Sequence, residues 1–568
     1  MNAAIVTLVM LGLLWLGYVF YGRLIERKCA QPDSERKTPA YELRDGVDYE
    51  PARPVMLFGH HFTNISGAGP IVGPVIAVAY FGWAACLGWI LLGSVLIGAV
   101  HDYLTLMVSV RMRGRSISDV AREVVSPRAS LVFGAFLWLA MVLVIAVFAI
   151  LATKTLISTP TVVIPNLGLI PVAMVMGLAV YRARVPLLPA TVVGVIILGF
   201  LLWLGHEHPI SLPSAWDDPF KVWLSIIFFY CFFASVLPIW LLLTPRDYLS
   251  SMIAVGGLVL GFVGLFAAAP TVNAPAHISF VTEKGPFWPM LFILVACGAV
   301  SGFHAIVSGG TTAKQLPNEK YARPIGYGSM LVEAALAVQV TFLVGAGLYW
   351  VGRHLGPDGR SLVLGEIMAQ GGGPAEAFIR GFGAVLSRGL PFISFSLGML
   401  FAAIILNATL LDTLDTCTRL GRFVLEEAGE RFFGRLHSKW LSNIVASIIT
   451  LAPAAYLAWS GGAQVIWPVF GAANQLIAAL ALFVISVYLV GVRRPSMYTF
   501  IPGSFMLLTT VGALIYQAWR FFFGPQPKLV LGFISLVLIA LALFVAAEVI
   551  PRALALRSQP KPAPADDG

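Results

Sequence analysis

Long apolar runs, separated by short polar and charged segments, follow one another along almost the whole chain. A helix that crosses a bilayer needs about 20 consecutive apolar residues, and about fifteen runs reach that length. They cover residues 3–22, 57–82, 84–110, 130–152, 160–180, 187–205, 220–243, 250–270, 288–313, 325–351, 390–418, 441–459, 464–490, 499–519 and 529–550. The pattern predicts an all-α polytopic membrane protein with about fifteen transmembrane helices.

The composition excludes a soluble protein. Hydrophobic residues make up 58% of the 568 residues and charged residues only 11%, whereas soluble proteins carry about 25% charged residues. Such a chain cannot cover itself with a polar surface. It also contains no HExxH, GxSxG or Walker pattern, so we do not expect an enzyme. The five cysteines form no CxxC pair, which favours small buried side chains over a disulfide or a zinc site.

The net charge of +9 reflects how the basic residues are distributed among the loops. With the N-terminus outside, 28 of the 37 Lys and Arg residues lie on the inner side. The positive-inside rule therefore predicts an N-outside, C-inside topology and an odd number of spans. The basic residues form no single solvent-facing patch, so the expected partner is a lipid bilayer and not a nucleic acid.

The chain divides into four predicted regions. Residues 1–56 hold the first span, which lacks the basic start of a signal peptide, and a basic cytoplasmic loop that we expect to be at least partly ordered. Residues 57–420 are predicted to form a ten-helix core, and residues 421–551 four additional spans. The Pro-rich tail, residues 552–568, is expected to be a disordered cytoplasmic segment.

Two spans contain helix-breaking residues at membrane depth. The second span carries Gly67, Gly69 and Pro70 in its polar middle, and the seventh carries Pro238. Broken helices survive in a membrane where they are buried or line a cavity. Two breaks, five spans apart and opposite in direction, are typical of a five-plus-five inverted repeat. The alternative is two independent proline kinks.

Substrate is expected between these two breaks, near the middle of the membrane. The ends of half-helices there offer free N–H groups and a positive dipole to a carboxylate. The candidate substrate-binding residues are Asn64, Ser66, Gly67, Gly69, Tyr230, Ser235 and His304.

A second set of candidates would couple transport to an ion. Ser308, Thr311 and Thr312 are spaced i, i+3 and i+4, so their oxygens can converge on one helix face and suit a small cation. The alternative is that the threonines hydrogen-bond to their own helix. Asp102 and Glu333 lie inside spans, where a charge is costly, so they and His304 are candidates for binding a proton. No cofactor other than Na⁺ or H⁺ is expected.

Other polar residues in the spans have structural interpretations. Asp412, Asp415 and Arg419 share a helix face and are expected to form an ion pair at the cytoplasmic end. Arg246 and Asp247 are expected to anchor the chain or gate its inner face, and not to contact substrate. Neighbouring helical side chains point apart, so His60 and His61 are not expected to bind a metal. The amides Asn474 and Gln475 are expected to join helices outside the core.

Several blocks of the sequence resemble the carbon starvation protein A (CstA) family. They are residues 57–62 (Leu-Phe-Gly-His-His-Phe), 68–74 (Ala-Gly-Pro-Ile-Val-Gly-Pro), 235–248, 301–315, 322–333, 413–420 and 467–476. These blocks are long, keep their order and span roughly residues 50–490. Known relatives are often longer than this chain.

The resemblance implies a LeuT-type inverted-repeat fold within the amino acid–polyamine–organocation superfamily. Such proteins are inner-membrane importers, induced when carbon runs short, that take up peptides or pyruvate. In that fold the unwound middles of core helices one and six hold substrate. A sodium-type site lies between core helices one and eight, where Thr311 and Thr312 would match a Thr/Ser pair. The family's Gln-Asp in the third span is His101-Asp102 here, so only Asp102 carries over.

We therefore expect a secondary active importer of a small carboxylate-bearing nutrient, working by alternating access. Peptides are the first candidate substrates, and symport of pyruvate with a cation or a proton is the alternative. A channel and a nutrient sensor without coupled transport are the other classes. The sequence leaves the oligomeric state open.

Overall fold

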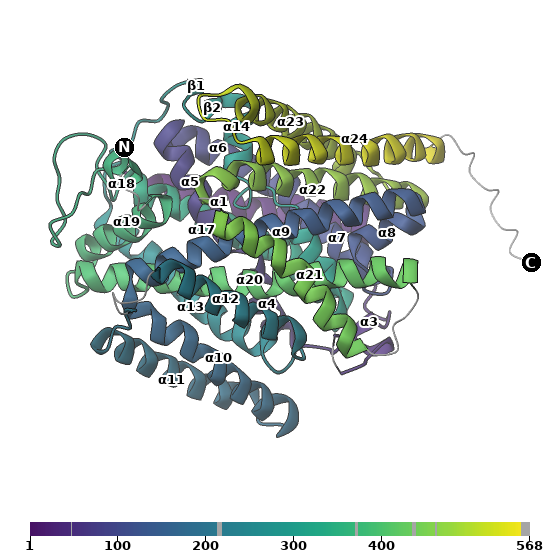
Figure 1. Cartoon of the computed structure of the whole chain (residues 1–568), viewed down its shortest axis with the longest axis horizontal. Coiled ribbons are helices and arrows are strands. Elements are labelled where there is room, and N and C mark those ends of the chain that lie inside the picture. The colour runs from purple at the N-terminus through teal and green to yellow at the C-terminus, as the bar shows by residue number, and fades with distance from the viewer. Residues whose placement is uncertain (47, 213–217, 370–372, 434–438, 461–462, 558–568) are drawn as a thin grey trace, which may run out of the picture.

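The computed structural model describes residues 1–46, 48–212, 218–369, 373–433, 439–460 and 463–557. These residues form long α-helices, most of which run along the long axis of the molecule, and one short hairpin of β1 (Val281–Thr282) and β2 (Gly285–Pro286) (Figure 1). Helix α1 begins at one end of the helix stack and α24 finishes at the other (Figure 1). An odd number of crossings separates such ends, as the predicted N-outside, C-inside topology requires.

The first eight predicted spans correspond to helices in the first half of the chain. Two of these begin at side-chain caps followed by proline, since Ser126 Oγ accepts from the N–H of Ala129 at 3.0 Å and Asp218 accepts from the N–H of Phe220 at 3.1 Å. The spans are α1 (Ala3–Leu16) continued by η1 (Gly17–Tyr21), α2 (Gly22–Ile25) and η2 (Glu26–Ala30); α4 (Pro54–Ile65) with α5 (Gly69–Tyr80); α6 (Trp83–Gly93) with η3 (Ser94–Gly98) and α7 (Ala99–Arg111); α9 (Pro127–Ser158); η4 (Pro160–Val162) with α10 (Val163–Gly177) and η5 (Leu178–Arg182); α11 (Leu187–Glu207); α12 (Pro219–Val236); and α13 (Leu243–Ala268).

The second half of the chain supplies the remaining spans. They are α14 (Phe287–Leu294) with α15 (Phe303–Val307), η6 (Ser308–Thr312) and α16 (Ala313–Gln315); η7 (Glu319–Tyr321) with η8 (Arg323–Gly328) and α17 (Ser329–Gly345); α20 (Phe395–Phe433); α21 (Lys439–Ser460); α22 (Ala463–Gly491); α23 (Met497–Phe523); and α24 (Leu529–Arg557). Within the described residues, 13 helices are long and apolar enough to cross a membrane, and the bent pair α4–α5 makes up to 14. The interrupted segment α14–α16 accounts for the ninth predicted span.

Four short helices lie between the spans. At the inner end are α3 (Pro39–Glu42) and α8 (Ile117–Val124), and at the outer end are α18 (Leu364–Ala369) and α19 (Gly373–Gly389) (Figure 1). The inner loop after span one is ordered over its described residues. The N–H of Ala52 donates to Gln315 O at 3.0 Å, and the N–H of Asp33 donates to Glu319 at 2.8 Å.

The packing of the helices repeats itself with inverted direction. Helix α9 packs along α20, and α12 packs against α21. The α4 half of one broken span packs against α13, while the α14 and α15 halves of the other pack against α22. The short helices α19 and α8 take corresponding places in the two repeats, since α19 packs on α13 and α8 packs on α22. Six spans lie between α4–α5 and α14–α15, so the two broken spans run in opposite directions.

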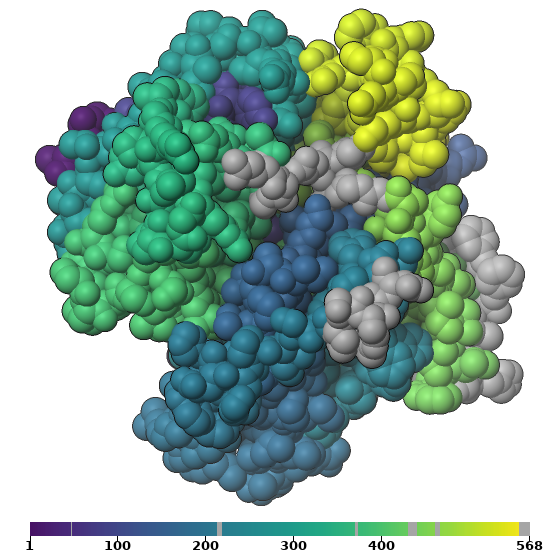
Figure 2. Space-filling view, turned by 60° about the vertical axis from the view of Figure 1, so that its left-hand side comes forward, coloured from purple at the N-terminus to yellow at the C-terminus, as the bar shows by residue number. Residues whose placement is uncertain are grey.

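Helices α10 and α11 form a hairpin at the edge of the molecule, which Figure 2 shows as a projecting lobe. The repeat relation therefore favours a core that skips this hairpin and includes α21 and α22. The predicted regions, with a core of residues 57–420, remain a prediction.

The break in the ninth span is held by two neighbouring amides of α22. The carbonyl oxygens of Asn474, main-chain and side-chain, accept from the N–H of Gly302 at 3.0 Å and of Phe303 at 2.8 Å. Gln475 donates to Phe292 O at 2.6 Å. Backbone groups freed by a broken helix must find partners inside a membrane. Asn474 and Gln475 therefore join helices, as predicted, and they do so at the break itself.

Replacing Asn474 by alanine is expected to lower the thermal stability of the detergent-purified protein. The buried N–H of Phe303 would lose its acceptor, which costs about 1–3 kcal/mol. Ser535→Ala is the matched control, because the hydroxyl of Ser535 is buried but donates only within its own helix, to Leu531 O. Equal melting temperatures for Asn474→Ala and the control would contradict this role.

Candidate functional site

The break in the second span lies between α4 and α5, which meet at an angle of 41°. Helix α4 ends at Ile65, and Pro70, which lacks an N–H, occupies the first turn of α5. The break is closely packed. A Cβ added at Gly67 would lie 2.7 Å from the Phe148 ring, and one at Gly69 would lie 2.2 Å from Cys297 Sγ. The break predicted here is present, and glycine is required at both positions.

The partner of this break is in the ninth span and not, as we predicted, in the seventh. Helix α12 ends at Val236 because Pro238 holds Leu237 in an extended conformation, and the next helix, α13, begins at Leu243. The prediction of a broken seventh span opposite the second was therefore wrong. Instead, the non-helical residues 295–302 of the ninth span lie against α5. A Cβ added at Gly73 would lie 2.5 Å from the carbonyl oxygen of Leu294.

The substrate candidates of the second span lie at the break, whereas those of the seventh lie elsewhere. Asn64 and Ser66 are fully buried, and Ser66 Oγ has no hydrogen-bond partner among the described residues. Ser235 instead contacts α21, with its hydroxyl 2.9 Å from Ser447 Oγ. Tyr230 donates to Asp415 and accepts from Arg246. The structure therefore does not bring Tyr230 and Ser235 together at the break; their role in binding remains a prediction.

The ionisable candidates Asp102, His304 and Glu333 form one buried chain across three helices. Asp102 Oδ2 lies 2.7 Å from His304 Nδ1, and Asp102 Oδ1 lies 2.7 Å from His101 Nδ1. His304 Nε2 lies 3.3 Å from Glu333 Oε2, although the two atoms are not aligned for a hydrogen bond. All four side chains are fully buried. The arrangement can store a proton and pass it between α7, α15 and α17.

The three hydroxyl groups of the ninth span that are candidates for binding a cation do not share one hydrogen-bonding environment. Thr311 Oγ1 donates to Val307 O at 3.0 Å, which is the back-bonded alternative, and Thr312 Oγ1 lies 2.8 Å from His61 Nδ1. Ser308 Oγ has no partner among the described residues. The three hydroxyls lie in the inner half of a broken span, next to α7 and α4.

A second buried polar cluster was not predicted as a unit. His60 Nδ1 lies 2.6 Å from Asp247 Oδ2, and Asn64 Nδ2 donates to the same oxygen at 2.8 Å. Arg246, in the first turn of α13, pairs with Asp412 at 3.1 Å and with Asp415. We call these residues, with Tyr230, the Arg246 cluster. Arg246 and Asp247 lie close to two acidic residues that come more than 160 positions later in the chain. No local sequence pattern could have predicted this contact.

The predicted ion pair of Arg419 with Asp412 and Asp415 was wrong. Arg419 instead donates to the carbonyl oxygens of Ala234, at 3.1 Å, and Leu237. These carbonyls are left without helical partners because α12 ends there. Arg422 donates to Ser235 O at 2.8 Å for the same reason. The two arginines therefore cap α12 and leave Arg246 to bind the carboxylates.

His60 and His61 point to different clusters, towards Asp247 and Thr312 respectively. Within the described part of the chain, no three His, Cys, Asp or Glu side chains are grouped closely enough to hold a metal ion.

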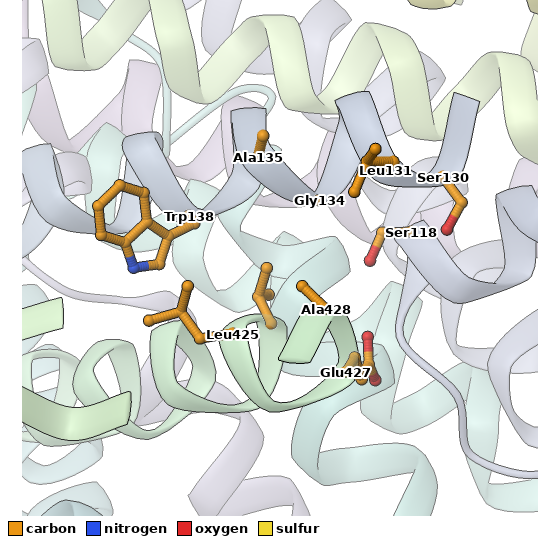
Figure 3. Close-up of a pocket in the computed structure, with 10 residues that line it drawn as sticks. Ser118, Ser130, Leu131, Gly134, Ala135, Trp138, Leu425, Glu427 and Ala428 are labelled. Carbon is orange, nitrogen blue, oxygen red and sulfur yellow. The ribbon is translucent and has the colours of Figure 1, made fainter. Parts of the chain in front are cut away.

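A further cavity of about 170 Å³ lies between α8, α9 and α20, close to the inner end of the bundle. Figure 3 shows Trp138 and Leu425 on facing helices at one end and Ser118 and Glu427 at the other. Ser116 Oγ donates to Glu427 at 2.7 Å. No motif in the sequence pointed to this cavity, because its lining is mostly apolar.

An inverted repeat, two opposed broken spans and buried ionisable residues beside them together define a membrane-embedded secondary transporter. The chain matches the family model described as "Carbon starvation protein CstA" over residues 2–350 and 360–513. It therefore belongs to the carbon starvation protein CstA family.

Curated relatives support this membership. The chain is 34% identical to the peptide transporter CstA of Mycobacterium tuberculosis over 90% of this chain and 74% of that protein. It is 33% identical to the peptide transporter CstA of Escherichia coli, over 92% and 81%, and 32% identical to the pyruvate/proton symporter BtsT of Escherichia coli, over 88% and 79%. Among solved structures, a manganese transporter of Eremococcus coleocola aligns with 91% of this chain at 13% identity and a TM-score of 0.45.

Proposed function

We propose that this protein is a secondary active importer that carries small carboxylate-bearing nutrients across the bacterial inner membrane by alternating access. The observation that carries the proposal is the contact between two oppositely directed broken spans in the middle of the bundle, at Gly69 and Cys297. Broken helices in this arrangement are where secondary transporters bind their cargo.

Peptides are the first candidate substrates, because several curated relatives are named peptide transporters. Pyruvate is the second, because another relative of similar identity is named a pyruvate/proton symporter. Both substrates carry a carboxylate. The N-terminal end of α5, which begins at Gly69 beside the unpartnered hydroxyl of Ser66, would offer such a group a positive dipole.

The coupling ion is proposed to be a proton held by Asp102, His304 and Glu333. A fully buried group of two carboxylates and an imidazole, with His304 2.7 Å from Asp102 and 3.3 Å from Glu333, is suited to bind a proton reversibly. Sodium at Ser308, Thr311 and Thr312 is the second candidate. The geometry favours it less, because the Thr311 hydroxyl donates within its own helix and the Thr312 hydroxyl contacts His61.

Proteoliposomes loaded with the purified protein are expected to accumulate labelled pyruvate or a labelled dipeptide when the outside is acidic. An imposed proton gradient should raise accumulation several-fold over equilibrium, whereas an imposed sodium gradient at equal pH should not. Accumulation that is the same with and without either gradient would reject symport and leave passive flux.

Replacing Glu333 by glutamine is expected to lower proton-driven accumulation at least tenfold while exchange of labelled for unlabelled substrate continues. The amide cannot release a proton, but the binding surface around the breaks stays intact. Glu283→Gln, in an exposed outer loop, is the matched control and should behave like the wild type. Full proton-driven accumulation by Glu333→Gln would show that this carboxylate does not carry the coupling proton.

A further inference from the structure

Arg246 is a buried cation whose side chain is only 1% exposed and which sits among three carboxylates. Its guanidinium contacts Asp412, Asp415 and the Tyr230 hydroxyl at once. Asp412 also accepts from Ser250 Oγ at 3.2 Å. The guanidinium is therefore held in place mainly by groups that are themselves acidic.

The charges in the Arg246 cluster do not balance. Asp247, Asp412 and Asp415 face Arg246, while the nearby Arg419 is engaged with backbone carbonyls and with Asp48. Among the residues that the structure describes, one oxygen of each of these three aspartates has no hydrogen-bond partner, and neither has Arg246 Nε. An unpaired buried charge is strongly destabilising, so protons must neutralise part of the cluster. The titratable and charged groups facing the two α20 carboxylates are His60 of α4, Tyr230 and Cys231 of α12, Arg246 and Asp247 of α13, and Arg419 of α20 itself.

The cluster adjoins the break in the second span. The hydroxyl of Thr413, the neighbour of Asp412, donates to Thr409 O at 2.9 Å and lies 3.3 Å from Asn64 O. A Cβ added at Gly67 would lie 2.7 Å from Thr413 Oγ1. Asn64 also donates to Asp247. The carboxylates that bind Arg246 are thus one and two residues along α20 from Thr413, which lies against the place proposed to hold substrate.

We propose that Arg246 binds the carboxylate of the substrate, and that it becomes free to do so when Asp412 or Asp415 takes up a proton. This inference rests on the proposed function and adds the residue that recognises the substrate's charge. A proton from the outer solution forms an O–H bond on the aspartate, whose ion pair with Arg246 is lost. The guanidinium then donates two N–H groups to the substrate carboxylate. When the substrate leaves to the inside, the proton is released and the original ion pair re-forms.

Planar guanidinium groups suit this exchange because they bind a carboxylate through two parallel hydrogen bonds. The substrate and the resident aspartates compete for one cation, so substrate binds poorly while both aspartates are ionised. Binding of substrate and binding of this proton, which is separate from the one held by Asp102, His304 and Glu333, are thereby linked.

The test measures the apparent affinity of the purified, reconstituted protein for pyruvate and for dialanine from pH 6 to pH 8, by competition with exchange of labelled substrate. For the wild type, affinity should fall about tenfold per pH unit above the titration range if one proton is linked. The neutral amides of both probes should not compete at any pH. The amide comparison needs no variant, so it is independent of any folding defect.

Asp412→Asn and Asp415→Asn remove one resident charge each. At least one of them should bind the probes at pH 8 as tightly as the wild type does at pH 6, with the pH dependence reduced. Arg246→Lys should weaken binding at least tenfold at every pH, because an ammonium group lacks the paired donors. Arg323→Lys is the matched control, because Arg323 pairs with Glu26 at 2.9 Å at the inner end of the bundle, where both side chains are partly exposed. It should match the wild type.

Two results would overturn the inference alone. One is that both aspartate variants transport as the wild type does and keep its pH dependence. The other is that the neutral amides compete as strongly as the acids. Failure of the wild type to transport either probe would instead reject the proposed function, and this inference with it.

Discussion

The structure depends on satisfying backbone groups where two helices are interrupted inside the membrane. Lipid offers no hydrogen bonds, so each freed N–H and C=O must find its partner in the protein. Helix α22 supplies Asn474 and Gln475 to the ninth span. On α20 the Thr413 hydroxyl, which donates to Thr409 O at 2.9 Å, lies 3.3 Å from the carbonyl oxygen of Asn64 at the end of α4. The scaffold helices α20 and α22 thereby fix the geometry of the breaks, and with it the site where cargo would bind.

Buried charge is organised on both sides of α4. One chain joins Asp102 to His304 and Glu333, and the Arg246 cluster lies on the side of α12, α13 and α20. The neighbouring residues His60 and His61 face these two regions separately, because successive side chains on a helix diverge by about 100°. A movement of α4 against its neighbours would therefore change the contacts of both regions together.

Much of the fold could be predicted from the sequence, because membrane spans and proline-dependent breaks follow from local patterns. The apolar runs located the fifteen spans, and Gly67, Gly69 and Pro70 located the first break. The second break was assigned to Pro238, a visible signal, but this proline only ends α12. The true break, residues 295–302, contains no proline; its small residues Gly298, Ser301 and Gly302 were the available signal. The pairing of Arg246 with Asp412 and Asp415 could not be predicted, because it depends on how distant helices pack.

The proposed alternating access requires that residues 295–302 and the α4–α5 break, which are closely packed here, move apart and open in turn to the two sides of the membrane. Cys297 lies in this segment against Gly69, and it can serve as the probe once the other four cysteines are replaced by serine or alanine. A membrane-impermeant maleimide should label Cys297 from either side of the proteoliposome membrane. Transported substrate should change the rate of labelling from each side. A protein that transports normally while Cys297 stays unlabelled from both sides would contradict the account.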